Sequence, residues 1–381
     1  MDFDFNNDQL ALRNLVEKTL KNECPVEEVR KLMETDDGYS EGHWTTMAEQ
    51  GWMGIAIPEE YGGVGLGVID LFVIMEEMGA SLCPSPFFAT AVLGAQAILR
   101  GGSEAQKKEY LSKVSAGEIK LTLAVQEDDT VSGDFYIRGS AGKHGCNYVL
   151  NGNKLFVPYA HAADAVICAM RTGGHPADKE GISLFIVDPG ADGVQRRILK
   201  TMDMTTRQCE IVLDNVVVSE SALLGPPDQG GKILRDVVDY ATVAMCGEML
   251  GGMRKSFDLA LEYTKIREQF GRPIGSFQVL KHYLADMMVM KENAKSIAYY
   301  AACAMNDGTE DKALACSMAK AYCADAFTHI VNQAVQIFGG IGFSWEHDIH
   351  LYLKRAKNLS LTFGDSDYHR CRVADLIGLG E

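Results

Sequence analysis

The spacing of apolar residues changes twice along this chain, and these two changes constrain its fold more than any other feature. Up to about residue 116 the apolar side chains recur at helical spacing, as they do between Leu71 and Met78. From about residue 120 short β-rich runs such as LTLAVQE and GISLFIVD follow one another. Helical spacing returns in long segments after Gly230. The order predicts a helical domain, a β domain and a second helical domain, at residues 1–119, 120–229 and 230–381.

The middle domain is expected to fold as a compact antiparallel barrel or sandwich, because its β-rich runs are short and separated by turn residues. Asn151-Gly152 lies between two apolar runs and predicts a hairpin turn. The glycine-rich run from Gly225 to Lys232 resembles a phosphate loop, but it lacks the register and the following Ser or Thr. We interpret this run as a linker that leads into a helix.

The C-terminal domain is expected to be an antiparallel four-helix bundle. Its helical segments are rich in alanine, whose small side chain lets helices pack closely. The N-terminal domain is likewise expected to be a helical bundle. The expected C-terminal helices span residues 232–268, 277–305, 311–338 and 347–359, with a shorter one at 366–377.

Charge and cysteine content exclude several classes of function. Fifty-two acidic residues against thirty-six basic ones give a net charge of −16, which disfavours a nucleic-acid-binding surface. No apolar run approaches the roughly 18–20 residues that cross a bilayer, and the acidic start is unlike a signal peptide. The ten cysteines include no C-x-x-C pair, which favours reduced thiols in a cytoplasmic protein over a disulfide scaffold or a zinc site.

Two short motifs could carry chemistry but are better explained by structure. Ser317 and Lys320 match S-x-x-K, yet the other elements of that catalytic signature are absent, so we expect a packed helix. His347 and His350 are three residues apart among carboxylates, a spacing that could bind a metal. No third ligand can be placed, and these residues are interpreted as polar groups at a helix start. The sequence therefore predicts no metal site.

Two segments are not explained by packing alone. One ends a long helical run with Arg267, Phe270 and a Gly-Arg-Pro break, and the other has three glycines within four residues from Gly339. One glycine is enough to end a helix, whereas several permit the close approach of a ligand or a partner. An arginine near such glycines is a plausible anion site, because its planar fork suits phosphate.

These segments belong to four motifs that, in this order, resemble the acyl-CoA dehydrogenase family along nearly the whole chain. The resemblance implies FAD bound between the subunits of a homotetramer or a related assembly. It also implies oxidation of a CoA thioester between its α and β carbons, with an electron-transferring flavoprotein as the electron acceptor. The motifs are IPEEYGG at 57–63, LNGNKLFVPYAHAAD at 150–164, REQFGRPIGSFQ at 267–278, and QIFGGIGF at 336–343 with HLYLKRAK at 350–357.

The resemblance assigns six residues to the ADP half of the FAD that a neighbouring subunit binds. They are the Arg and Phe of the family's RxxFG segment, the Gln that follows it, and the Gln and glycine pair of QxxGG. An arginine opposes the charge of pyrophosphate, and glycines let the backbone reach it. All six are present: Arg267, Phe270, Gln278, Gln336, Gly339 and Gly340.

The flavin half of the motif set matches poorly. The family's T-E-P-x-A-G-S-D loop, which holds the isoalloxazine and the substrate, corresponds here to residues 124–130, where the Gly-Ser pair is missing. The W-I-T element that packs on the flavin becomes Phe156-Val157-Pro158, so the threonine donor is lost.

Neither position that carries the family's catalytic base holds a carboxylate. The chemistry needs a carboxylate that removes the α-proton while hydride leaves the β-carbon. Aligned on the family, the two positions hold Phe363 and Ala241. Asp365 lies two residues after the first position and is the candidate for an unorthodox base, although a plain helix cap is the preferred interpretation of this residue.

Three hypotheses follow from this pattern. The first is a subunit of a heterotetramer, as in bacterial acyl-CoA dehydrogenases that act on bulky CoA esters such as steroid side-chain intermediates. A second subunit would then supply the base and the isoalloxazine pocket. The second is an active homotetramer that uses Asp365. The third is a non-catalytic binding or scaffold protein without FAD, which the six retained residues disfavour.

Overall fold

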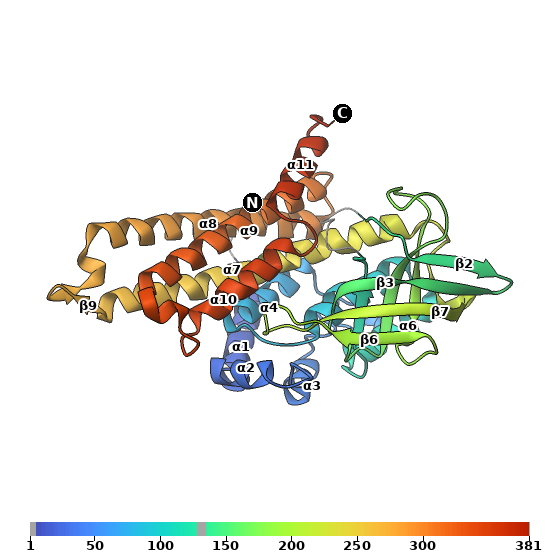
Figure 1. Cartoon of the computed structure of the whole chain (residues 1–381), viewed down its shortest axis with the longest axis horizontal. Coiled ribbons are helices and arrows are strands. Elements are labelled where there is room, and N and C mark those ends of the chain that lie inside the picture. The colour runs from blue at the N-terminus through green and yellow to red at the C-terminus, as the bar shows by residue number, and fades with distance from the viewer. Residues whose placement is uncertain (1–4, 128–134, 381) are drawn as a thin grey trace. The chain divides into compact units, whose positions relative to one another are not determined.

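The computed structural model describes residues 5–127 and 135–380, whose contacts form two compact units. One unit, here the helical unit, contains the segments up to Lys31, Val68–Cys83 and the chain from Thr242 on. The other, here the sheet unit, contains Leu32–Gly67 and Pro84–Ala241. Each unit combines parts of more than one expected domain, so the expected boundaries remain predictions. The N-terminal helices, middle sheet and C-terminal helices occur in the expected order (Figure 1).

The helical unit is organised around α9, which contacts α8, α10 and α11, while α4 contacts both α1 and α8. Every C-terminal helix lies within two residues of its predicted range at both ends, which confirms the long helical segments. The helices of this unit are α1 (Asn7–Glu23), α4 (Val68–Ser81), α7 (Gly230–Ile266, whose first third lies in the sheet unit), α8 (Gln278–Asp307), α9 (Lys312–Phe338), α10 (Ile349–Leu361) and α11 (Ser366–Leu376).

Close crossing of α4 and α7 depends on two glycines. A Cβ placed on Gly79 would lie 2.0 Å from the carbonyl oxygen of Glu248, and one on Gly251 would lie 1.8 Å from that of Glu76. Any side chain at these positions would force the two helix backbones apart. Gly79 and Gly251 therefore permit the close packing of these two helices.

The sheet unit is built on one mixed sheet with the strand order β6-β7-β3-β2-β4-β5-β8. Most pairs are antiparallel, but β1 pairs with β4 in parallel and so does β2 at one position. The strands are β1 (Leu121–Ala124), β2 (Ser140–His144), β3 (Asn147–Pro158), β4 (Ala165–Arg171), β5 (Ile182–Val187), β6 (Val194–Ile198), β7 (Gln208–Ser219) and β8 (Leu223–Leu224). The shorter helices of this unit are α3 (Glu41–Glu49), a π-helix (Phe88–Gly94), α5 (Ala95–Gly101) and α6 (Glu104–Ser115), whereas α2 (Val26–Met33) lies in the helical unit up to Lys31.

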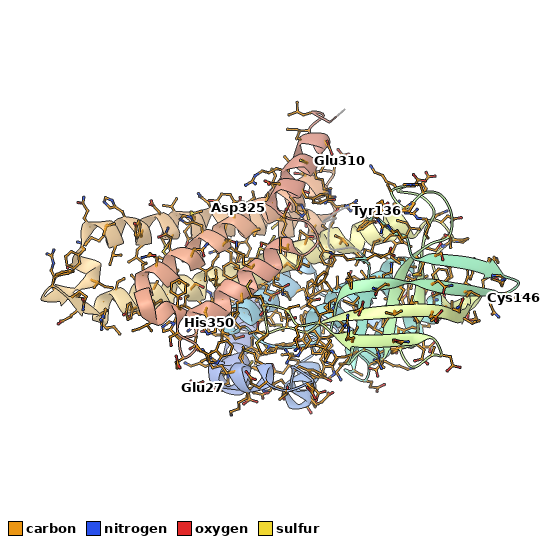
Figure 2. The ribbon with its side chains drawn as sticks, viewed as in Figure 1. Glu27, Tyr136, Cys146, Glu310, Asp325 and His350 are labelled. Atoms are coloured by element: carbon orange, nitrogen blue, oxygen red, sulfur yellow. The ribbon has the colours of Figure 1, made fainter. Side chains whose placement is uncertain are left out.

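The hairpin turn predicted at Asn151-Gly152 is wrong. Strand β3 runs straight through both residues, and its register with β7 shifts there. A Cβ on Gly152 would lie 2.7 Å from the Cα of Gly139, so this glycine permits a close backbone contact at an irregularity. The actual turn joins β2 to β3, with Cys146 at its outer end (Figure 2).

The glycine-rich run before α7 is confirmed as a linker with a helix start. Helix α7 begins at Gly230, and the glycines pack against the segment that leads into β5. A Cβ on Gly230 would lie 2.9 Å from the oxygen of Ile182, and one on Gly231 would lie 2.5 Å from that of Lys179. Among the helices described, none is both long and apolar enough to cross a membrane.

Candidate functional site

A two-residue hairpin joins α7 to α8 and displays an aromatic ring. The strands β9 (Glu268–Gln269) and β10 (Arg272–Pro273) pair around Phe270 and Gly271, whose φ angles are +53° and +77°. Two positive φ values suit the twist of a two-residue hairpin, but they are unfavourable for phenylalanine, by about 1–3 kcal/mol. Phe270 is 92% exposed. The hairpin therefore holds a strained, solvent-facing aromatic side chain.

The glycine pair after α9 leaves open space above the backbone. Gly339 has φ +64° and ψ −137°, a conformation that is essentially restricted to glycine. A Cβ built on Gly339 or on Gly340 would meet no described atom within 4 Å. The backbone at this point is therefore accessible to another molecule.

The hairpin and the glycine pair lie at the same end of the helical unit. The ring of Tyr263 near the end of α7 packs against that of Phe338, the last residue of α9, with 4.6 Å between centroids. The amide of Arg267 donates to the oxygen of Tyr263, and Gly339 follows Phe338 directly. Gln278 begins α8 just after the hairpin. Figure 1 shows the hairpin at the tip of α7 and α8.

The structure thus gathers at this end all six residues that the sequence assigns to the ADP half of FAD; we call them the bundle-end group (Arg267, Phe270, Gln278, Gln336, Gly339 and Gly340). The side chains of Arg267, Gln278 and Gln336 are exposed, and none makes a hydrogen bond or ion pair with any residue that the structure describes. A guanidinium, two amides and an open glycine backbone are donors that fit an anion such as pyrophosphate. The group fits the ADP half of FAD by this test.

The two expected base positions carry side chains that cannot accept a proton. Ala241 on α7 is fully buried. Phe363, in the turn between α10 and α11, has φ +56°, and its carbonyl oxygen lies 3.1 Å from Nε2 of His369. Neither position can provide general-base catalysis.

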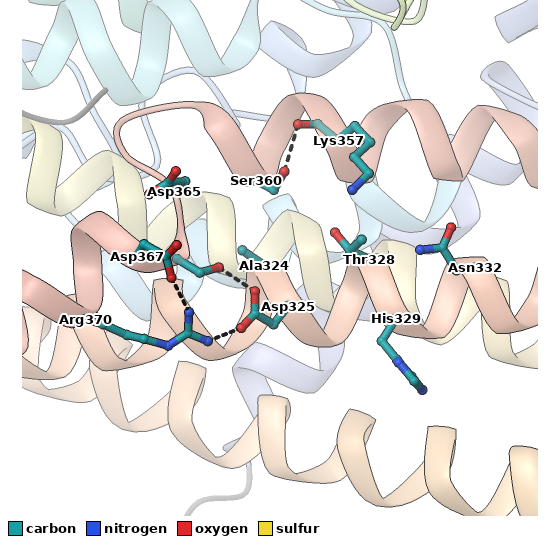
Figure 3. Close-up of a pocket in the computed structure, with 11 residues that line it drawn as sticks. Ala324, Asp325, Thr328, His329, Asn332, Lys357, Ser360, Asp365, Asp367 and Arg370 are labelled. Carbon is teal, nitrogen blue, oxygen red and sulfur yellow. Dashed lines mark hydrogen bonds and ion pairs between the residues drawn. The ribbon is translucent and has the colours of Figure 1, made fainter. Parts of the chain in front are cut away.

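Asp365, the alternative candidate, is committed to a helix cap. Its Oδ1 accepts from the amide of Tyr368 at 2.9 Å, which caps the N-terminus of α11. Asp365 also lies on the wall of an open pocket of about 440 Å³ between α9, α10 and α11 (Figure 3). The pocket is polar: Asp325 accepts from Ser366 and pairs with Arg370. Nothing in its lining resembles an apolar channel for an acyl chain.

The segment that corresponds to the family's flavin loop lies partly outside the described residues, which omit 128–134. The described end of the loop shows a contact that the sequence did not predict. Glu127 forms a buried ion pair with Lys154, at 2.5 Å, and also accepts from the amides of Arg138 and Gly139. Phe156 is 41% exposed and has φ +54°, a second strained aromatic residue.

The motifs that we set aside behave as packing and helix-start residues. Ser317 and Lys320 are fully buried inside the helical unit, which confirms a packed helix. Nδ1 of His347 accepts from the amide of Ile349 at the start of α10, and His350 contacts the oxygen of Trp345. Over residues 5–127 and 135–380 no three His, Cys, Asp or Glu side chains are grouped to hold a metal ion.

Comparison with known proteins finds matches along nearly the whole chain. Three family models match: acyl-CoA dehydrogenase N-terminal domain at 6–118, middle domain at 122–216 and C-terminal domain at 228–378. The acyl-CoA dehydrogenase of Bacillus subtilis (strain 168) is 30% identical over 372 residues, which cover 96% of this chain and 97% of that protein.

Two solved structures extend this similarity to the fold. Butyryl-CoA dehydrogenase from Megasphaera elsdenii has a TM-score of 0.90 and 26% identity, covering 99% of this chain and 100% of that one. A variant of the Tcur3481-Tcur3483 steroid ACAD has a TM-score of 0.87 and 29% identity, covering 97% of both chains.

Proposed function

Because this chain belongs to the acyl-CoA dehydrogenase family, we propose that it is one subunit of a two-protein acyl-CoA dehydrogenase. In this proposal it holds the ADP half of the FAD bound by its partner subunit, and it supplies no catalytic base. The partner, a second family member, supplies the carboxylate and the isoalloxazine pocket. The substrate is a CoA thioester, and an electron-transferring flavoprotein takes up the electrons.

One observation carries this proposal. All six residues of the bundle-end group are present, and its polar side chains have no hydrogen-bond partners among the described residues, whereas both base positions are apolar. Arg267, Gln278 and Gln336 are exposed and have no side-chain hydrogen-bond partners among the described residues, so their donors are available to the ADP half of FAD. A chain that completed the reaction alone would need a carboxylate where Phe363 or Ala241 stands.

The similarity to a steroid enzyme named for two proteins supports the assembly and the substrate class. The Tcur3481-Tcur3483 steroid ACAD is 29% identical to this chain. We accordingly propose a bulky acyl group, such as a steroid side chain, on the CoA thioester.

Each member of the bundle-end group has a defined task in this proposal. Arg267 opposes the charge of the pyrophosphate, Gln278 and Gln336 offer amide hydrogen bonds, and Gly339 and Gly340 let the backbone approach. Phe270 supplies an apolar ring at the edge of the site. When bound, FAD supplies the acceptor for the hydride that leaves the β-carbon.

The test is the flavin absorbance and oligomeric mass of this chain, purified alone and then co-expressed with a family member that carries Glu at a base position. We expect a colourless lone chain and a yellow pair that contains half as many FAD molecules as subunits. A yellow lone tetramer with one FAD per chain would overturn the proposal. A pair without flavin would indicate a scaffold protein instead.

The active homotetramer remains the second candidate, because Asp365 lies on the wall of a solvent-open pocket. The substitution Asp365→Asn separates the two, since asparagine caps helices as well as aspartate but cannot remove a proton. Loss of turnover in a folded Asp365→Asn variant would favour the homotetramer, whereas unchanged turnover would remove Asp365 as the base.

A further inference from the structure

His347 joins the two ends of the loop between α9 and α10, which we call the glycine loop (residues 339–348). Its ring packs against that of Phe338, the last residue of α9, with 4.1 Å between the centroids. Its Nδ1 accepts a hydrogen bond of 3.1 Å from the amide of Ile349, the first residue of α10. Because the glycine pair follows Phe338 directly, one side chain contacts both flanks of the segment that holds the open glycine backbone.

The hydrogen bond from Ile349 serves as the cap of α10. The first amides of a helix have no partner within it, so a side chain or water must accept from them. Asp348 is at the N-cap position, but its side chain makes no capping hydrogen bond within the described chain. Its carboxylate instead pairs with Arg30 of α2, with 2.8 Å between Oδ1 and Nη2. His347 therefore takes the role that a capping Ser, Asp or Asn usually has.

This contact requires a neutral imidazole at His347. A backbone N–H can only donate, so Nδ1 must present its lone pair, and the proton of the ring lies on Nε2. A proton on Nδ1 would place two N–H groups against each other and remove the cap. It would also add a positive charge at the N-terminus of α10, where the helix dipole disfavours cations. The hydrogen-bond geometry by itself therefore indicates that protonation opens the contact.

The charged groups of the described chain that face His347 are Asp348 and Arg30, and their effects oppose each other. Burial lowers the pKa of His347 below the usual value of histidine, and Arg30 acts in the same direction, whereas the carboxylate of Asp348 raises it. In an open loop the ring is hydrated and takes up a proton near the usual pKa of about 6.5. The closed loop is thus stabilised above about pH 6.5 and loses this stabilisation as the pH falls below it.

We propose that His347 is a positioning residue for the glycine pair and makes the bundle-end group sensitive to pH, because a proton on Nδ1 releases the glycine loop. The effect on FAD rests on the function proposed above, whereas the release of the loop does not. The bundle-end group then holds the ADP half of FAD firmly at neutral pH and less firmly below about pH 6.5.

Hydrogen exchange of the full chain, followed by mass spectrometry at about pH 7.5 and about pH 5.5, tests the release of the loop. Rates are divided by the intrinsic rate of an unstructured peptide at each pH, which gives protection factors. For peptides covering 339–349, protection should fall about 5-fold at the lower pH, the factor that corresponds to the loss of one helix cap. Peptides from the first half of α9 serve as the internal reference and should change less.

Three variants make the test specific to His347. His347→Asn keeps a side-chain acceptor for the amide of Ile349 but cannot titrate, so it should abolish the fall in protection. His347→Ala has no acceptor and should show low protection at both pH values. His329→Gln is the matched control, since this exposed histidine of α9 makes no hydrogen bond through its side chain with any described residue. It should preserve the fall.

Titration of the FAD-free assembly with FAD at the same two pH values tests the effect on the bundle-end group. The native assembly should lose affinity at the lower pH, by at most about 5-fold, because only the fraction of chains with a closed loop binds well. The assembly with His347→Asn should lose less. An equal loss in both assemblies would refute the regulation of FAD binding by His347.

Constant protection of the glycine loop in the unmodified chain would overturn the proposal, and so would a fall of equal size in His347→Asn. An equal fall in the peptides of α9 would show a global effect and refute a specific release of this loop. An assembly that binds no FAD at either pH would overturn the function proposed above, and the exchange measurements would then decide the role of His347 alone.

Discussion

The bundle-end group and the turn between α10 and α11 lie in the same helical unit, but they use their polar groups in opposite ways. At the bundle end, Arg267, Gln278 and Gln336 are exposed and make no side-chain hydrogen bond or ion pair with any described residue. At the turn, Lys320 and Asp365 are bonded to backbone groups. Polar side chains left without internal partners are available to a ligand, whereas those bonded to the backbone maintain a conformation. The comparison separates residues that we expect to bind a ligand from residues that we expect to maintain the conformation of the chain.

The substitution Arg267→Ala should have the largest effect on binding. Removal of a guanidinium that faces a pyrophosphate costs about 2–3 kcal/mol in hydrogen bonds to charged groups. We therefore expect the affinity of the assembled enzyme for FAD to fall about 100-fold, with little change in stability, because the exposed side chain of Arg267 makes no hydrogen bond or ion pair with a described residue. The measurement is a titration of the FAD-free assembly with FAD.

Lys265→Ala is the matched control for Arg267→Ala. This lysine is also exposed at the end of α7, but it pairs with Glu262, and such surface pairs contribute at most about 1 kcal/mol. Its loss should leave FAD affinity unchanged. Equal FAD affinity in both variants would show that the bundle-end group does not bind the cofactor.

The two glycines after α9 differ in backbone conformation, although a Cβ at either position would meet no described atom within 4 Å. Gly339 has a backbone conformation that only glycine adopts readily, whereas Gly340 is not among the residues with positive φ. Gly339→Ala should lower the free energy of unfolding by about 1–3 kcal/mol. Gly340→Ala should change it by less than about 0.5 kcal/mol, because its Cβ meets no described atom within 4 Å.

Urea unfolding of the two variants measures the stability difference, and FAD titration of the assembly adds a second readout. Gly340→Ala should weaken FAD binding if the cofactor approaches the backbone there. Equal loss of stability in both variants would contradict the conformational argument.

Long-range periodicity explains why the sequence predicts some elements well. The C-terminal helices match their predicted ranges within two residues, because each holds one spacing of apolar and small residues over several turns. The hairpin predicted at Asn151-Gly152 fails because a dipeptide is a local signal. Here the extended pairing of β3 with β7 decides the conformation, and the glycine serves a close contact with Gly139.

The features of the candidate site also differ in how far the sequence predicts them. The six residues of the bundle-end group were named from short motifs that resemble the family's, and their role toward FAD stays a prediction. The hydrogen bonds of Lys320 to backbone oxygens could not be predicted, because a lysine in a helix is normally solvated. Its burial depends on three carbonyl oxygens that lie about forty residues later in the chain. The same holds for the pairing of Lys154 with Glu127.

The smallest expected effect concerns the cap at Asp365. Asp365→Ala removes the acceptor for the amide of Tyr368 and should lower the free energy of unfolding by about 1 kcal/mol, whereas Asp365→Asn should leave it nearly unchanged, since both native and replaced side chains cap well. Urea unfolding at neutral pH distinguishes the two variants. An alanine variant as stable as the native chain would show that the carboxylate is not needed as a cap. Asp365 would then again be a candidate for the base, and the difference between the two regions would be smaller than we expect.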